Sequence, residues 1–83
     1  MAASMQDIRG WLAHGKAQGA THVVVVCDTF DHDDYPVFVM PGENVRKRTE
    51  EYNSKNMQRV MEVYSLALDI ESQLGKHRAF HYD

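Results

Sequence analysis

A run of four valines stands out in the stretch Thr21-His22-Val23-Val24-Val25-Val26-Cys27. Apolar, β-branched residues in an unbroken run, without alternation, indicate a strand that is buried on both of its faces. We therefore predict a strand over Thr21–Cys27. Such a strand needs cover on both faces, and the rest of the chain has to supply it.

A second strand is predicted over Pro36–Met40, where proline is tolerated at the first position. The eight residues between the two strands, 28–35, are polar and rich in turn-forming side chains. We therefore expect the two strands to pair as an antiparallel hairpin.

Three helices complete the prediction. Met1–Ala20 has amphipathic spacing, and its Ser4 and Asp7 are placed as a capping box. A short helix is predicted over Asn44–Tyr52, with the asparagine as its N-cap. A long helix is predicted over Lys55–Leu74, because apolar residues occupy most of its circumference at helical spacing.

The predicted fold class is α+β: an N-terminal helix, a two-stranded antiparallel hairpin, a short helix and a long C-terminal helix. These elements form a single domain over residues 1–83, with a tail from about residue 76. The valine strand and the long helix carry more apolar surface than these elements can cover. We therefore predict a homo-oligomer, most simply a two-fold dimer. The alternative is that the short helix and the tail cover that surface within one chain.

Charge and composition narrow the function classes. The chain has 9 lysines and arginines against 12 acidic residues, a net charge of −3, so we do not expect binding to duplex nucleic acid. We see neither a membrane-spanning segment nor a secretory signal. A single cysteine, Cys27, excludes a disulfide framework; we expect it to be a reduced, inert thiol and the protein to be cytoplasmic.

The loop after the valine strand holds four carboxylates and one imidazole within Asp28–Tyr35. Asp28 or Asp31 could bind ribose hydroxyls or base amines, and Asp31 with Asp33 could bind Mg²⁺ or Mn²⁺. An EF-hand is excluded because the turn glycine and the final glutamate are missing. The simplest interpretation is a solvated acidic hairpin loop that is stabilised by Asx turns.

The C-terminal tail is basic and aromatic. His77 and His81 are four residues apart, but the glycine before them argues against a helix, so we predict no zinc site and no cofactor. Arg78 and the histidines could bind phosphate, while Tyr82 could stack on a base. Alternatively, Phe80 and Tyr82 fix the tail to a neighbouring core.

Two segments, Val26–Val37 and Asn56–Tyr64, resemble a family of small bacteriophage proteins. The resemblance implies a phage protein but brings no assigned activity with it. Small acidic phage proteins that oligomerise often act against host defences. One class of these, the sponges of cyclic oligonucleotide and cyclic ADP-ribose signals, is similar to this chain in size and in its expected oligomerisation.

We therefore expect a non-enzymatic anti-defence protein that sequesters a nucleotide-derived immune signal in pockets between subunits. Arg59 and Arg78 would bind phosphates, with Arg46 or Lys47 as further candidates, and aromatic side chains would stack on a base. The candidate ligand-binding residues are Asp28, Phe30, Asp31, Tyr35, Arg59, Tyr64, His77, Arg78, His81 and Tyr82.

Two alternatives from other classes remain. One is a protein-directed inhibitor, such as an anti-CRISPR, whose acidic loop imitates nucleic-acid phosphates or blocks a basic groove. The other is a small metal-dependent phosphodiesterase that uses Asp28, Asp31 and Asp33 with His32 or a histidine of the tail.

Overall fold

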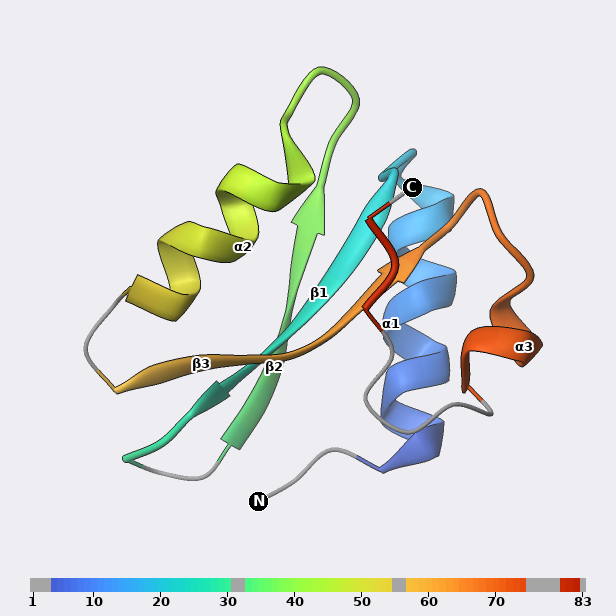
Figure 1. Cartoon of the computed structure of the whole chain (residues 1–83). Coiled ribbons are helices and arrows are strands. Elements are labelled where there is room, and N and C mark those ends of the chain that lie inside the picture. Colours follow the sequence, from blue (N-terminus) through green and yellow to red (C-terminus); the bar gives the residue numbers. More distant parts are fainter. Residues whose placement is uncertain (1–3, 31–32, 55–56, 75–79, 83) are drawn as a thin grey trace.

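The computed structural model of the chain describes residues 4–30, 33–54, 57–74 and 80–82. Its elements follow the order helix, strand, strand, helix, strand, helix. Figure 1 shows a central sheet with helices on both of its sides. The predicted residues Asp31, His77 and Arg78 lie outside the described residues.

The valine strand is the middle strand of a three-stranded sheet with the order β2-β1-β3. β1 (His22–Asp28) pairs antiparallel with β2 (Asp33–Val39) on one side and with β3 (Gln58–Ser65) on the other. The predicted burial on both faces is confirmed for Val23 to Val26, whose side chains are all 0% exposed, whereas Thr21 and Cys27 are half-buried.

The predicted two-stranded hairpin with a long C-terminal helix is wrong. Residues 58–65, which we expected in that helix, form β3, and α3 (Ile70–Leu74) is only 5 residues long. The third strand therefore comes from a segment whose apolar residues have helical spacing.

A β-bulge in β3 explains the error. Val25 pairs with Glu62 and Val26 with Val60, so Met61 is an extra residue in the strand. A bulge shifts the alternation of side chains by one position. Val60 and Val63 consequently share one face of the sheet although they are three residues apart, which is also the spacing of a helix face.

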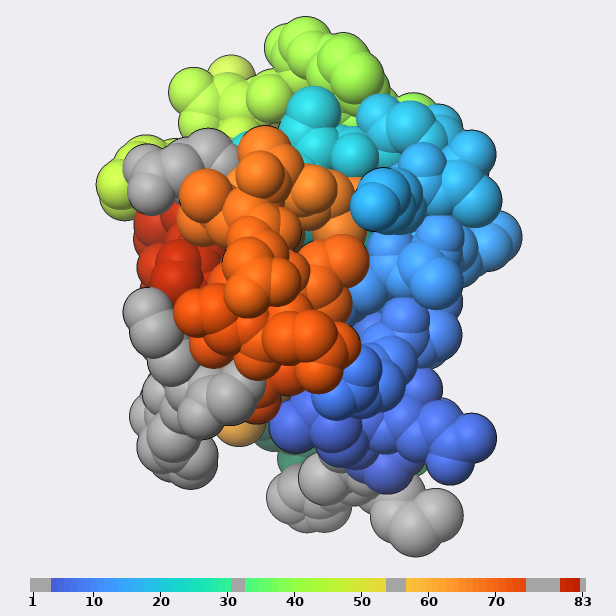
Figure 2. Space-filling model, turned by 90° about the vertical axis from the view of Figure 1, so that its right-hand side faces the viewer, coloured from blue at the N-terminus to red at the C-terminus, as the bar shows by residue number. Residues whose placement is uncertain are grey.

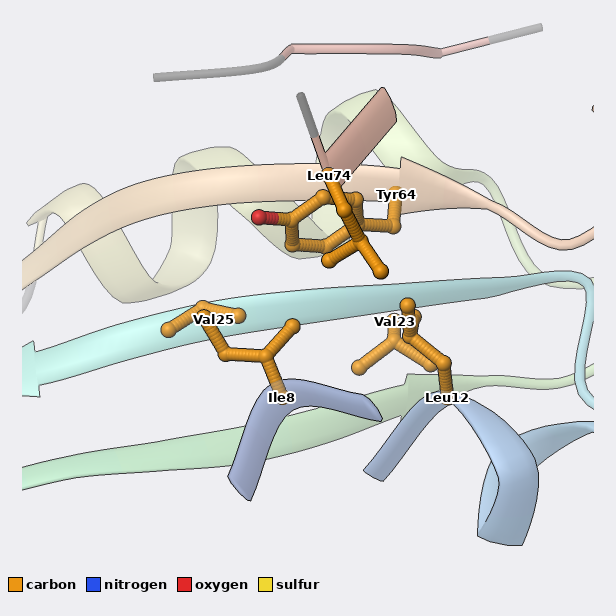
Figure 3. Packing of buried hydrophobic residues seen from close by; sticks show 6 residues of the cluster. All are labelled: Ile8, Leu12, Val23, Val25, Tyr64 and Leu74. Atoms are coloured by element: carbon orange, nitrogen blue, oxygen red, sulfur yellow. The ribbon is translucent and has the colours of Figure 1, made fainter. Parts of the chain in front are cut away.

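Each face of the sheet has its own core. The α1 face combines α1 (Met5–Ala17), α3 and the odd-numbered valines of β1 (Figure 3). The α2 face packs against α2 (Val45–Ser54). The buried residues of the α1 face are Ile8, Leu12, Val23, Val25, Tyr64 and Leu74, and those of the α2 face are Val24, Val26, Val37, Val39, Val60 and Val63.

The predicted helix caps are confirmed at both N-termini. The Ser4 hydroxyl accepts a hydrogen bond from the Asp7 backbone N–H, and the Asp7 carboxylate accepts one from the Ser4 backbone N–H. The donor–acceptor distance is 3.1 Å in both. Asn44 Oδ1 accepts a hydrogen bond from the Lys47 backbone N–H at the start of α2. These interactions stabilise helices whose sequences have moderate intrinsic propensity.

The end of β3 is fixed to α3 by a buried glutamine. The Gln73 side chain, 2% exposed, accepts a hydrogen bond from the Ser65 backbone N–H and donates one to the Ser65 carbonyl, at 2.7 and 2.8 Å. The Arg9 guanidinium also binds the Glu71 carboxylate and links α1 to α3 at the surface. Figure 2 shows these two helices side by side on one face of the molecule.

The surplus of apolar surface that led us to expect an oligomer is covered within one chain. Helices lie over both faces of β1, and the accessible surface of 5072 Å² is close to the roughly 5,000 Å² expected for a folded monomer of this mass. Oligomerisation remains a prediction, but uncovered apolar surface no longer supports it. Among the described residues, none of the helices has the length and apolar character needed to cross a membrane.

Gly15 allows α1 to approach the sheet closely. A Cβ at this position would lie 3.0 Å from Val23 Cγ2 and 3.1 Å from Phe38 Cδ1. Gly10, in the same helix, faces open space. Two chemically identical substitutions therefore separate helix propensity from packing.

We predict that Gly15→Ala lowers the free energy of unfolding by about 1 kcal/mol, because overpacking outweighs the gain in helix propensity. Gly10→Ala should raise the free energy of unfolding by about 0.5–1 kcal/mol, because the added methyl group contacts no other atom and alanine has the higher helix propensity. Urea denaturation of both variants measures the two changes. Equal stabilisation by both substitutions would contradict the close packing at Gly15.

Candidate binding site at the hairpin tip

The sheet topology brings two connections of the chain together at one end. Asp28, the last residue of β1, pairs with Asp33 at the start of β2 and with Gln58 at the start of β3. The β1–β2 turn and the α2–β3 connection therefore emerge at the same end of the sheet (Figure 1). A hydrogen bond of 2.9 Å from the Thr29 backbone N–H to the Met57 carbonyl joins them.

Two large apolar side chains are exposed on these joined connections. Phe30 is 70% exposed and Met57 is 46% exposed. Asp28 Oδ1 accepts a hydrogen bond of 2.9 Å from the Phe30 backbone N–H, so an Asx turn fixes the backbone that carries the ring. We call Asp28, Phe30, Asp33, Met57 and Arg59 the tip surface.

The backbone of Met57 is strained. Its φ of 63° lies in the left-handed region, which costs a residue with a Cβ about 1 kcal/mol or more. Glycine would adopt this conformation without that cost. The side chain is also largely outside the core, so the fold gives no reason for methionine at this position. The sequence pattern gives no signal for Met57, because its helical spacing predicts this residue inside a long helix.

Three of the ten predicted ligand-binding residues lie on the tip surface, namely Asp28, Phe30 and Arg59. Cys27 of β1 lies directly opposite Asp34 of β2 and Arg59 of β3, so these three residues form one row across the sheet. Arg59 is exposed, whereas Cys27 and Asp34 are half-buried. Arg59 lies on the face of the sheet that carries Cys27 and Asp34, whereas Asp28 and Asp33 lie on the opposite face at the same end.

Tyr35 lies beside the tip surface but points into the α2 face. Its hydroxyl donates a hydrogen bond to Gln58 Oε1, and its ring meets the ring of Tyr52 edge-on, with centroids 6.4 Å apart. Burial raises the pKa of Tyr35, and the nearby Tyr52 and Asp28 raise it further. The hydroxyl is therefore a neutral donor at neutral pH, already engaged within the chain.

Tyr64 lies on the other side of the sheet from Tyr35. Its side chain is 1% exposed within the α1 face (Figure 3), and its hydroxyl donates a hydrogen bond of 2.6 Å to the Glu62 carboxylate. Burial, together with the charge of Glu62, raises the pKa of Tyr64 far above its ordinary value. In this conformation the ring is covered and cannot stack on a base.

The C-terminal residues of the predicted site lie along β3. Phe80 forms a parallel bridge with Val63, and the His81 backbone N–H donates to the Val63 carbonyl over 2.9 Å. Tyr82 packs against the core of the α2 face. The guanidinium of Arg46 lies 4.3 Å from the centroid of the Tyr82 ring. Two groups that we expected to bind a base and a phosphate therefore contact each other.

The acidic loop gives no metal site within the described residues, where no group of three histidine, cysteine or acidic side chains is placed to hold an ion. The predicted ligand Asp31 lies outside those residues. Asp28 instead caps the turn at Phe30, as the simplest interpretation of the loop required.

The Cys27 thiol lies next to these carboxylates. Burial raises the pKa of Cys27, and its hydrogen bond with Asp34 and the negative charges of Asp34 and Asp28 raise it further. Because the thiolate is the nucleophile, a raised pKa lowers the reactive fraction at a given pH. The expectation of an inert thiol agrees with this environment.

We predict that Cys27 in the folded protein reacts with iodoacetamide several-fold more slowly at pH 8 than in the urea-denatured chain. Asp34→Asn removes the negative charge and should accelerate the reaction, whereas Cys27→Ser gives the blank. Mass spectrometry of the labelled protein against time measures the rates. A folded protein that is alkylated as fast as the denatured chain would contradict the raised pKa.

Comparison with known proteins found no matching protein family, no matching curated protein and no matching solved structure.

Proposed function

We propose that the protein is a non-catalytic binding protein that docks its tip surface onto a partner protein and thereby inhibits it. The observation that carries the proposal is the pair of exposed apolar side chains, Phe30 and Met57, on two hydrogen-bonded connections. Exposed apolar groups that gather within a polar rim are typical of protein contact sites, where aromatic and methionine side chains are enriched. The strained backbone of Met57 supports the proposal, because the largely exposed side chain makes no core packing that would offset this conformational cost.

The charges around the tip surface define the chemistry of the partner. Among the described residues, Asp28 and Asp33 belong to the tip surface, the half-buried Asp34 follows them, and Arg59 is the one cation of the tip surface. The complementary surface is an apolar pocket that is rimmed by lysine and arginine. A protein groove that binds nucleic acid has such a rim. Occupation of that groove would block its normal ligand.

The nucleotide-sequestering hypothesis ranks second. It requires aromatic rings that open onto one shared pocket, whereas the sheet separates Tyr64 from Tyr35 and Tyr82. Arg46 already covers one face of the Tyr82 ring. The sheet also separates Asp28 from Arg59, because Arg59 lies opposite Cys27 and not opposite Asp28.

We predict that Phe30→Ser and Met57→Gly each weaken binding to the partner by about 30-fold, the loss of roughly 2 kcal/mol that is typical of a buried anchor residue. Met57→Gly should not lower the free energy of unfolding, because glycine relieves the positive φ. The immobilised full chain is used to capture a partner from bacterial lysate, the source that the resemblance to phage proteins suggests. The purified partner is then titrated by calorimetry.

Two exposed apolar residues elsewhere serve as matched controls. Leu68→Ser, at 40% exposure in the turn after β3, and Met5→Ser, at 49% exposure in α1, should leave the affinity unchanged. Binding should also weaken as the salt concentration rises, because the rim charges are screened. A stoichiometric partner that binds all four variants equally, or a retained nucleotide without any protein partner in native mass spectrometry, would overturn the proposal.

A further inference from the structure

The methionines of the described residues differ in their surroundings. Met40 and Met61 are half-buried, whereas Met5 and Met57 are 49% and 46% exposed. Of the two exposed thioethers, only that of Met57 belongs to the tip surface. Its backbone carbonyl accepts the hydrogen bond from Thr29, and its side chain is not part of either buried core.

An exposed thioether is open to oxidation by hydrogen peroxide. The sulfur lone pair attacks one peroxide oxygen, an S–O bond forms, and the O–O bond breaks to release hydroxide, which takes the proton from the new S–OH group. The sulfur is oxidised to a sulfoxide, and the peroxide is reduced to one molecule of water. The product is polar and chiral, and methionine sulfoxide reductases restore the thioether.

We propose that Met57 is a reversible oxidation site that switches off docking of the tip surface, an inference that rests on the proposed function. A sulfoxide at Met57 would place an unpartnered polar oxygen in the apolar centre of the contact. The fold tolerates the same change, because the side chain lies outside both cores. Oxidation of the half-buried Met61 would act on the fold instead, since its side chain packs against the core of the α1 face.

The first experiment needs no partner. The folded full chain is treated with dilute hydrogen peroxide, and peptide mapping by mass spectrometry measures the oxidation of each methionine against time. Met57 and Met5 should oxidise several-fold faster than Met40 and Met61, while the urea midpoint stays unchanged after the fast phase. Slow oxidation of Met57, or unfolding that accompanies it, overturns the inference whatever the partner is.

The second experiment uses the partner captured by the untreated protein. Oxidation should weaken its binding at least about tenfold, and treatment with methionine sulfoxide reductase should restore it. Met57→Leu keeps an apolar side chain without sulfur, so this variant should bind the partner and remain insensitive to peroxide. Met5→Leu should bind and remain as sensitive as the unmodified sequence.

These outcomes separate the two proposals. A partner that binds the oxidised and reduced proteins equally overturns the switch and leaves the docking function intact. Failure of the untreated protein to bind any partner through Phe30 and Met57 overturns the docking function, and the proposed switch falls with it, even where Met57 oxidises selectively.

Discussion

Burial of β1 on both faces is the constraint on which the rest of the structure depends. Val23 to Val26 are completely buried, and each fully buried valine contributes roughly 1.5–2 kcal/mol. Burial of this kind requires a strand on each side and a layer on each face. The chain supplies β2 and β3 as neighbours, α1 and α3 on one face, and α2 on the other (Figure 1). All the other helices and strands of the described residues therefore take part in covering β1.

Local signals made several elements predictable. The valine run indicated β1, the Ser4–Asp7 capping box indicated α1, and Asn44 indicated the start of α2. β3 could not be predicted in the same way, because the bulge at Met61 gives its apolar residues a spacing of three. A strand interrupted by a bulge and a helix then share one sequence pattern, and only the need of β1 for a second neighbour distinguishes them.

That ambiguity also created the expectation of an oligomer. A helix over residues 55–74 would be apolar around most of its circumference, which demands a partner. A strand with the same residues divides them between two faces: Val60 and Val63 contact the α2 face, while Met61 and Tyr64 contact the α1 face. On a helix these side chains would leave apolar surface uncovered, whereas in a strand they fill the cores on both faces of the sheet. With residues 58–65 in a strand, no second subunit is needed to cover them.

The candidate site shows the same dependence on topology. Asp28 and Phe30 could be identified from the sequence because they follow a buried strand. Met57 could not, since it joins them only through the pairing of β1 with β3 and the hydrogen bond from Thr29. In the order β2-β1-β3, with both outer strands antiparallel to β1, the end of β1 must meet the beginnings of β2 and β3. The connections that precede β2 and β3 therefore meet at one end of the sheet, and this topology brings exposed residues of both connections to that end.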